Sequence, residues 1–305
     1  MTEQHAAILH ELEQVVAENL ERHLKAAKPW QPHDYVPWSR GRDFAFLGGQ
    51  DWVPEDSPLD PVAKAALTVN LLTEDNLPSY HREIATRFGR DGAWGSWVGQ
   101  WTAEEARHSI ALRDYLVVTR GVDPTALENM RMAHMIHGYD SGDKTPLQAL
   151  AYVSFQELAT RLSHRNTGKA SGCPIADQLL QRVALDENLH MIFYRNLMGA
   201  ALDIAPDLAM AAIRDEVVGF NMPGMGMPGF QDNAILIAKA GIYDLRVHHD
   251  DVLLPVLRFW RISERCDFGP DGEQAREQVI GFLQLVDERA KHYEEKAATR
   301  QSVPV

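Results

Sequence analysis

The sequence predicts an all-α protein whose core is a bundle of four long helices. Three observations favour this class. Apolar residues recur at steps of three and four along most of the 305 residues, and the strict alternation of a half-buried strand is nearly absent. Turns rich in glycine and proline separate the periodic stretches. Two copies of a Glu-x-x-His pattern lie in long periodic stretches, where residues three apart share one helix face.

The N-terminal region should form a helix followed by a long loop. In residues 4–27, apolar side chains such as Leu12 and Val16 fall at helical spacing. Residues 28–61 carry repeated prolines and several aromatic side chains, including Trp30. The prolines break the helical pattern and the aromatics need burial, so this segment is expected to wrap the core as an extended loop.

The core bundle is expected over about residues 62–202. Turn signals at Gly89–Gly92 and at Gly168–Pro174 each separate two of its helices. The four long helices are predicted at residues 62–87, 93–120, 147–167 and 175–202.

Shorter helices surround this core. One is predicted at residues 125–137, and the C-terminal helices, spanning 206–297 in all, are predicted at 206–220, 232–240, 249–261 and 272–297. No shift in composition divides the chain, so residues 1–305 are expected to form a single domain.

Composition narrows the class of protein. The net charge of −13 argues against nucleic acid or an anionic membrane as the main partner. Cys173 and Cys266 lie far apart, which argues against a disulfide framework. The start of the chain has no basic, apolar signal pattern, and no apolar run reaches the roughly 20 residues of a membrane span. These features predict a cytoplasmic protein with no integral membrane segment.

Six acidic and histidine side chains repeat with one spacing. Each half of the core reads as a glutamate, a long gap and then Glu-x-x-His, and the offsets between matching residues are 83, 82 and 82 positions. The residues are Glu74, Glu105 and His108 in the first half, and Glu157, Glu187 and His190 in the second.

The long gaps are those of antiparallel hairpins. The midpoint between Glu74 and Glu105 falls in the Gly89–Gly92 turn, and the midpoint between Glu157 and Glu187 falls in the Gly168–Pro174 loop. Folding each pair about its turn therefore brings all six side chains to one height in the bundle. A lone glutamate from each of two helices and Glu-x-x-His from each of the other two is the arrangement of di-iron carboxylate proteins.

Charge supports a site for two ions. Four carboxylates balance two ferrous ions, and a neutral site costs far less to bury than uncompensated charge. Oxygen ligands also suit the higher oxidation states of iron, although manganese could substitute.

The sequence resembles a known family around these residues. The similarity runs from about residue 10 to 265, and it is to the soluble acyl-[acyl-carrier-protein] desaturases, especially the mycobacterial members. It implies a ferritin-like four-helix bundle with additional helices. The stretches that carry the family resemblance are Trp30–Asp34, Leu72–Tyr80, Trp101–His108, Ser154–Thr160 and Asp186–His190. Those typical of the mycobacterial members are Asp51–Trp52, Asp114–Arg120 and Ser163–Gly168.

The resemblance implies a role for each site residue. One iron would be bound by Glu74 and His108, the other by Glu157 and His190, with Glu105 and Glu187 bridging both. Three further residues would assist them. Asp186 would hold a ligating histidine, Trp30 would extend that network toward the surface as an electron route, and Thr160 would help deliver protons.

The implied reaction is the oxygen-dependent removal of two hydrogens from a saturated fatty acyl chain, leaving a cis double bond. A narrow apolar channel would hold the chain beside the irons. Acyl carrier protein would present the chain, ferredoxin or a similar donor would supply electrons, and the protein would be a homodimer. Asn188-Leu189 stands where the plant members carry basic residues, so the resemblance does not determine which surface binds the partners.

Other functions fit parts of the pattern. A related di-iron acyl-chain hydroxylase would share every ligand, and a ferritin-like iron-oxidising protein would share the bundle. A radical-generating reductase subunit would need a tyrosine beside the metals, and Tyr80 is poorly placed on a continuous helix. A degenerate paralogue is disfavoured because the ligand set is complete.

Four other features can be explained without a role at the metal site. The run Met222–Phe230 is expected to be a connecting loop, with a lid over the channel as the alternative. His248–Asp251 and the pair His134 and His137 are expected to be surface or helix-end residues, and Arg161, Arg165 and Lys169 form either a carrier-protein docking patch or a solvated face.

Overall fold

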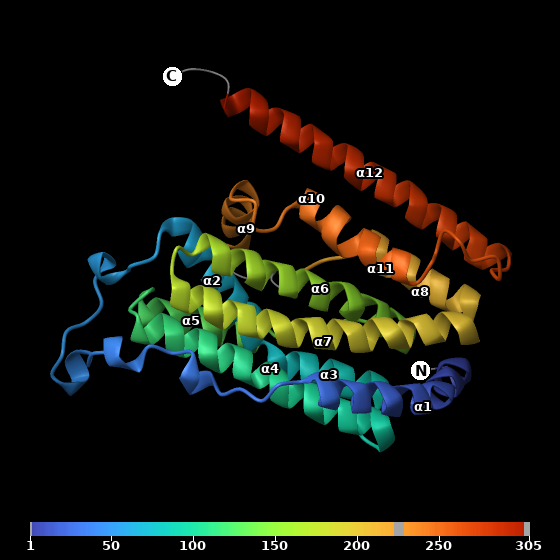
Figure 1. Ribbon diagram of the computed structural model, residues 1–305, viewed down its shortest axis with the longest axis horizontal. Helices are drawn as coiled ribbons and strands as arrows, with labels where there is room; N and C mark the ends of the chain where they lie inside the picture. The colour runs from blue at the N-terminus through green and yellow to red at the C-terminus, as the bar shows by residue number, and fades with distance from the viewer. Residues whose placement is uncertain (1, 223–228, 302–305) are drawn as a thin grey trace.

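The four long stretches predicted from the sequence lie side by side in the structure (Figure 1). The computed structural model describes residues 2–222 and 229–301, and within them it contains helices and no strand, which confirms the all-α prediction. The core elements are α2 (Pro61–Asp75), α3 (Leu77–Phe88), α4 (Gly92–Val118), α6 (Pro146–Ala170) and α7 (Pro174–Ile204).

Local sequence explains where the core helices start. Pro61, Pro146 and Pro174 each occupy the first helical position, where the missing N–H is not needed and φ is already helical. Before α6, the Thr145 hydroxyl accepts from the backbone N–H of Gln148, and the Gln148 side chain accepts from the N–H of Thr145. This reciprocal pair satisfies two donors that a helix start leaves free.

The prediction of one continuous helix over 62–87 is wrong. The structure divides this stretch at Asn76 into α2 and α3. Pro78 is the physical reason, because its ring removes an N–H and clashes with the carbonyl four residues earlier, which belongs to Glu74. The break therefore lies next to one of the predicted metal ligands.

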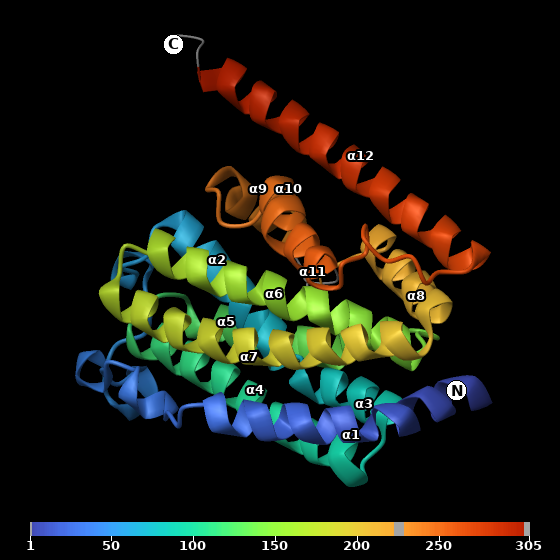
Figure 2. The same cartoon turned by 45° about the vertical axis from the view of Figure 1, so that its right-hand side comes forward.

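The N-terminal helix α1 (Glu3–Ala26) packs along α4 and α7 (Figure 2). The following loop contains short 3₁₀ turns, η1 (Pro32–Asp34), η2 (Trp38–Arg40), η3 (Ala45–Leu47) and η4 (Pro54–Asp56). The expected wrap is found in parts of this loop: Trp30, Val36 and Leu59 are buried, whereas Trp38 is 52% exposed and Phe46 is 96% exposed.

The remaining helices lie outside the core bundle, and α12 is the outermost, along α8 and α10 (Figures 1 and 2). Part of the predicted run Met222–Phe230, residues 223–228, lies outside the described residues. The helices outside the core bundle are α5 (Pro124–His137), α8 (Pro206–Val218), α9 (Phe230–Lys239), α10 (Leu245–Val247), α11 (Leu254–Phe259) and α12 (Pro270–Gln301).

The helix predicted at 249–261 has different bounds and is not uniform. It begins at Leu245, and a π-helical turn, η5 (His248–Leu253), precedes α11. Pro255 has no N–H to donate to the carbonyl of Asp251, so regular α-helical bonding cannot continue through this point.

Two apolar clusters lie on either side of a polar layer in the bundle. Along α4, Trp94–Trp101 belongs to one cluster and Ala111–Leu116 to the other, and Glu105 and His108 lie between them. The same change from one cluster to the other occurs along α7 around Glu187. The predicted metal layer thus lies between two close-packed apolar clusters.

None of the helices formed by residues 2–222 and 229–301 combines the length and the apolar composition that crossing a bilayer requires.

The packing of α1 gives a stability prediction. Leu12→Ala should lower the free energy of unfolding by about 2–5 kcal/mol, because Leu12 is fully buried and its truncation leaves a cavity. Leu24→Ala on the same helix should change it by about 0.5 kcal/mol or less, because Leu24 is 52% exposed. Urea unfolding followed by circular dichroism measures both, and equal losses would contradict the docked position of α1.

Candidate metal centre

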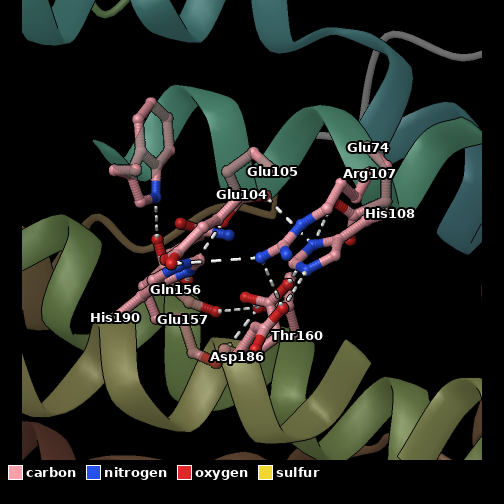
Figure 3. Close-up of polar contacts among 12 residues, drawn as sticks. Glu74, Glu104, Glu105, Arg107, His108, Gln156, Glu157, Thr160, Asp186 and His190 are labelled. Carbon is pink, nitrogen blue, oxygen red and sulfur yellow. Dashed lines mark hydrogen bonds and ion pairs between the residues drawn. The ribbon is translucent and has the colours of Figure 1, made fainter. Parts of the chain in front are cut away.

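The six predicted ligands meet in one buried layer of the bundle. They come from four helices: Glu74 from α2, Glu105 and His108 from α4, Glu157 from α6, and Glu187 and His190 from α7. Figure 3 shows the labelled carboxylates and imidazoles converging between α4 and the α6–α7 pair. The hairpin geometry expected from the two turns is therefore what the structure contains.

These side chains form two groups that could each hold a metal ion. In each group, the potential ligand atoms lie within 4.8 Å of one another. One group is Glu74, Glu105, His108 and Glu187, and the other is Glu105, Glu157, Glu187 and His190. Because Glu105 and Glu187 belong to both groups, they are placed to bridge two ions.

Spacing around the imidazoles fits metal coordination. His108 Nδ1 lies 3.1 Å from Glu187 Oε1, 3.4 Å from Glu105 Oε2 and 3.5 Å from Glu74 Oε2. Ligand atoms about 2.1 Å from a common ion and at right angles to each other lie about 3 Å apart. His190 Nδ1 similarly lies 2.7 Å from Glu105 Oε1 and 3.6 Å from Glu157 Oε2.

Several of these atoms are buried without a hydrogen-bond partner. Such orphaned groups are rare in folded proteins, because each loses its hydration without compensation. Here they face the same space, as metal ligands would. The unpartnered atoms are Glu105 Oε1, His108 Nδ1, Glu157 Oε2, Glu187 Oε1 and His190 Nδ1.

The electrostatics of the layer also favour bound cations. Burial, Glu187 and Glu105 raise the pKa of Glu157 well above its usual range. Burial alone would lower the pKa of His108, but Glu105 and its other acidic neighbours raise it well above the ordinary value. The buried negative charge of this cluster thus favours bound protons. Metal ions would compensate the same charge and displace those protons.

Comparison with known proteins identifies the family. A family profile described as fatty acid desaturase matches residues 4–304. The chain belongs to this fatty acid desaturase family. It is therefore an oxidoreductase of the desaturase type.

Named relatives cover nearly the whole chain. DesA1 of Mycobacterium tuberculosis, named as an acyl-[acyl-carrier-protein] desaturase, is 51% identical over 306 aligned positions, covering 97% of this chain and 90% of that protein. Stearoyl-[acyl-carrier-protein] 9-desaturase 6 of Arabidopsis thaliana is 31% identical, and the alignment covers 86% of this chain and 73% of that protein.

A solved structure shares the fold. The X-ray structure of DesA2 from Mycobacterium tuberculosis, titled as an acyl-ACP desaturase, superposes with a TM-score of 0.73 and 34% sequence identity. The match covers 88% of this chain and 99% of that one. The ferritin-like helical fold expected from the sequence is thereby confirmed.

In this desaturase, Asp186 and Trp30 lie beside His108. His108 Nε2 is 3.4 Å from Asp186 Oδ2, and Trp30 Nε1 donates to the same oxygen at 2.7 Å. Arg182 pairs with Asp186 as well, and Arg107 lies 3.3 Å from it. Burial would raise the pKa of Asp186, but His108, His190 and the Trp30 N–H lower it to about 2. The carboxylate therefore stays ionised and can accept a hydrogen bond from the imidazole.

Thr160 also lies in the layer. Its hydroxyl is 3.0 Å from Glu187 Oε2 and within 3.1 Å of the backbone carbonyls of Gln156 and Glu157. One hydroxyl proton can serve only one of these acceptors at a time. Thr160 can therefore pass a hydrogen bond between its own helix and a bridging carboxylate.

Sequence reasoning missed other partners of the ligands. His164 Nε2 lies 2.7 Å from Glu74 Oε1, and Trp101 Nε1 donates to Glu157 Oε1 at 3.1 Å. Two more missed residues are Glu104 and His23, which meet His190. Glu104 had a signal in the sequence, because it precedes Glu105 as Asp186 precedes Glu187. His164 had one as well, because it lies seven positions after Glu157 and so on the same helix face. Nothing in the sequence marked His23.

A pocket opens onto the carboxylates Glu74, Glu105, Glu157 and Glu187. Most of its lining surface is apolar, as expected for an acyl channel. Tyr139, Ser141 and Lys144 reach it from the segment between α5 and α6. The other lining residues include Tyr80, Ile84, Arg87, Trp101, Ala149, Tyr152, Val153 and Gln156.

Tyr80 departs from expectation in this cavity. It borders the same space as Glu74, and its buried hydroxyl has no hydrogen-bond partner. The expectation of a poorly placed side chain assumed one continuous helix. The break at Asn76 lies between Glu74 and Tyr80, so these two side chains do not keep the relative positions of one continuous helix.

The remaining candidates lie outside the centre. Within the described part of the chain, neither His134 and His137 nor the run His248–Asp251 belongs to a group able to hold a metal. Tyr243 Oη is 2.9 Å from His248 Nδ1, and Arg165 pairs with Asp177 at 2.5 Å. The surface or helix-end position expected for the histidine run is wrong for His249, which is buried within the π-helical turn η5.

Metal binding should stabilise the fold. Ferrous iron added without oxygen should raise the melting temperature of the native chain, with a gain of about 2.7 kcal/mol when free metal is about 100 times its Kd. Glu105→Ala should abolish this rise, because Glu105 belongs to both metal groups. Differential scanning calorimetry measures the shift.

The matched control is Glu11→Ala, which removes an exposed glutamate of α1. This variant should respond to iron as the native chain does. An undiminished rise in Glu105→Ala would contradict the metal centre.

Proposed function

We propose that this protein is an acyl-[acyl-carrier-protein] desaturase that introduces a cis double bond into a saturated fatty acyl chain at a centre of two iron ions. The observation that carries the proposal is the cavity that ends on both potential metal groups, because it gives a long substrate access to an otherwise buried site. The names of the relatives from Mycobacterium tuberculosis and Arabidopsis thaliana support the substrate class.

In this proposal, Glu74 and His108 hold one ion, Glu157 and His190 hold the other, and Glu105 and Glu187 bridge them. Two ferrous ions would supply the oxygen chemistry that removing hydrogens from an unactivated chain requires, and manganese could occupy the same ligands. One O₂, two electrons and two protons enter for each chain. Two hydrogens leave the chain, and two water molecules form.

The protein side chains position the reactants and the protons. The aromatic wall formed by Tyr80, Trp101 and Tyr152 fixes one stretch of the acyl chain beside the carboxylates, and holding reacting atoms in place can supply much of a rate enhancement. The Thr160 hydroxyl, 3.0 Å from Glu187 Oε2, can hold a proton at that oxygen.

An electron route is also proposed through Trp30. Its indole donates to Asp186, which in turn lies against His108, so the three side chains form a continuous bonded path to the layer. Ferredoxin or a similar donor would deliver the electrons. A homodimeric assembly and a cytoplasmic location complete the proposal.

The activity test uses the iron-loaded chain with ferredoxin, its reductase, O₂ and a ladder of saturated acyl carrier protein thioesters. We expect a cis double bond at one position of one chain-length class, located by mass spectrometry. A hydroxylated chain would establish the hydroxylase alternative instead, and no product across the ladder would also overturn the desaturase proposal. The same mixture without O₂ is the control.

A further inference from the structure

The two metal-binding histidines proposed above have matching partners on their outer nitrogens. Asp186 immediately precedes Glu187 and reaches across the bundle to His108. Glu104 immediately precedes Glu105 and reaches the opposite way, so that His190 Nε2 lies 2.9 Å from Glu104 Oε2. The internal repeat of the sequence, with its 82-residue offset, therefore extends to these two carboxylates.

Each carboxylate also meets a planar ring from the N-terminal region. The Trp30 ring donates to Asp186 and stacks on His108, with centroids 6.3 Å apart and planes 17° apart. The His23 ring lies 2.9 Å from Glu104 through Nε2 and stacks on His190, with centroids 5.8 Å apart and planes 19° apart. His23 thus occupies, in the second half of the centre, the place that Trp30 occupies in the first.

The surroundings fix this second arrangement. His23 is buried in the last turn of α1, and the edge of its ring packs against Trp97 at 5.1 Å. The other oxygen of Glu104 accepts from Gln100 Nε2 at 2.7 Å. Both oxygens of Glu104 are therefore occupied, and its carboxylate is held in one orientation.

We propose that Glu104 and His23 position His190 as a metal ligand, as Asp186 and Trp30 position His108. A carboxylate on the outer nitrogen of a ligating histidine fixes the proton there and raises the basicity of the inner nitrogen. That inner atom, His190 Nδ1, is buried, has no hydrogen-bond partner and lies in the second metal group. Helix α1 thereby completes one half of the centre without supplying a ligand.

The inference rests on the proposed two-metal site, and a double-mutant cycle tests it separately. The probe is Co²⁺, titrated into the full chain and followed by calorimetry. Glu104→Gln and Asp186→Asn are each placed in two backgrounds, His108→Ala and His190→Ala, each of which keeps one histidine. Asp186→Asn is the matched control because it acts on the other half.

In the His108→Ala background, Glu104→Gln should weaken Co²⁺ binding by about 10–100-fold, the usual cost of losing such a partner. In the His190→Ala background it should have no further effect, and Asp186→Asn should show the reverse pattern. In the chain with both histidines, Glu104→Gln should weaken one Co²⁺ step and leave the other unchanged.

His23 is tested by two substitutions of graded chemistry. His23→Leu removes the donor to Glu104 and should weaken the same Co²⁺ step. His23→Gln keeps an N–H donor and should recover part of the affinity. Circular dichroism should show native helix content for both variants.

Each other outcome has a definite meaning. Equal losses in both backgrounds, or no loss in either, would overturn the positioning role of Glu104, and equal affinities for His23→Leu and the native chain would remove His23 from it. A native chain that binds fewer than two Co²⁺ ions would instead overturn the two-metal site and the inference with it.

Discussion

The fold depends on burying four carboxylates at one level of a helical bundle. Glu74, Glu105, Glu157 and Glu187 are all buried, and the layer they form lies between two apolar clusters. Buried negative charges that lie so near one another repel strongly unless cations lie between them. The orphaned oxygens and the raised pKa of Glu157 follow from this constraint. Two divalent ions would satisfy it, and the two overlapping ligand groups give each ion a place.

The same constraint explains the contacts around the layer. A ligating imidazole must present the correct nitrogen, so each is fixed from outside by a carboxylate, Asp186 for His108 and Glu104 for His190. Those carboxylates must in turn be stabilised, and N–H donors from Trp30 and His23 provide this. The N-terminal region is thereby connected to the centre at two points.

Much of the site could be predicted because its information is local or periodic. The Glu-x-x-His spacing defines one helix face, and the two turns define which faces meet, so six residues on four helices could be grouped from the sequence alone. The starts of α6 and α7 followed from the same periodicity and from Pro146 and Pro174, whereas the predicted end of α6 at Gly168 is wrong, because the helix continues to Ala170.

What could not be predicted depends on contacts between distant segments. His23 lies on a helix face with no distinguishing pattern, and only the packing of α1 against the core reveals its partner. His164 shares a helix face with Glu157, but only the packing of α2 against α6 shows that it meets Glu74. The break at Asn76 could have been read from Pro78, but a strong apolar period concealed it. The exposure of Phe46 could not be predicted, because the sequence does not show whether an aromatic side chain in a loop is buried or exposed.

The central claim is that two metal ions share two bridging carboxylates in this layer. X-ray absorption of the chain loaded with two equivalents of ferrous iron measures it most directly. The arrangement predicts an iron–iron scattering distance of about 3.5–4 Å, with a shell of nitrogen and oxygen neighbours and no sulfur. Two bound irons with no iron–iron scattering at such a distance, or sulfur among the nearest neighbours, would contradict it.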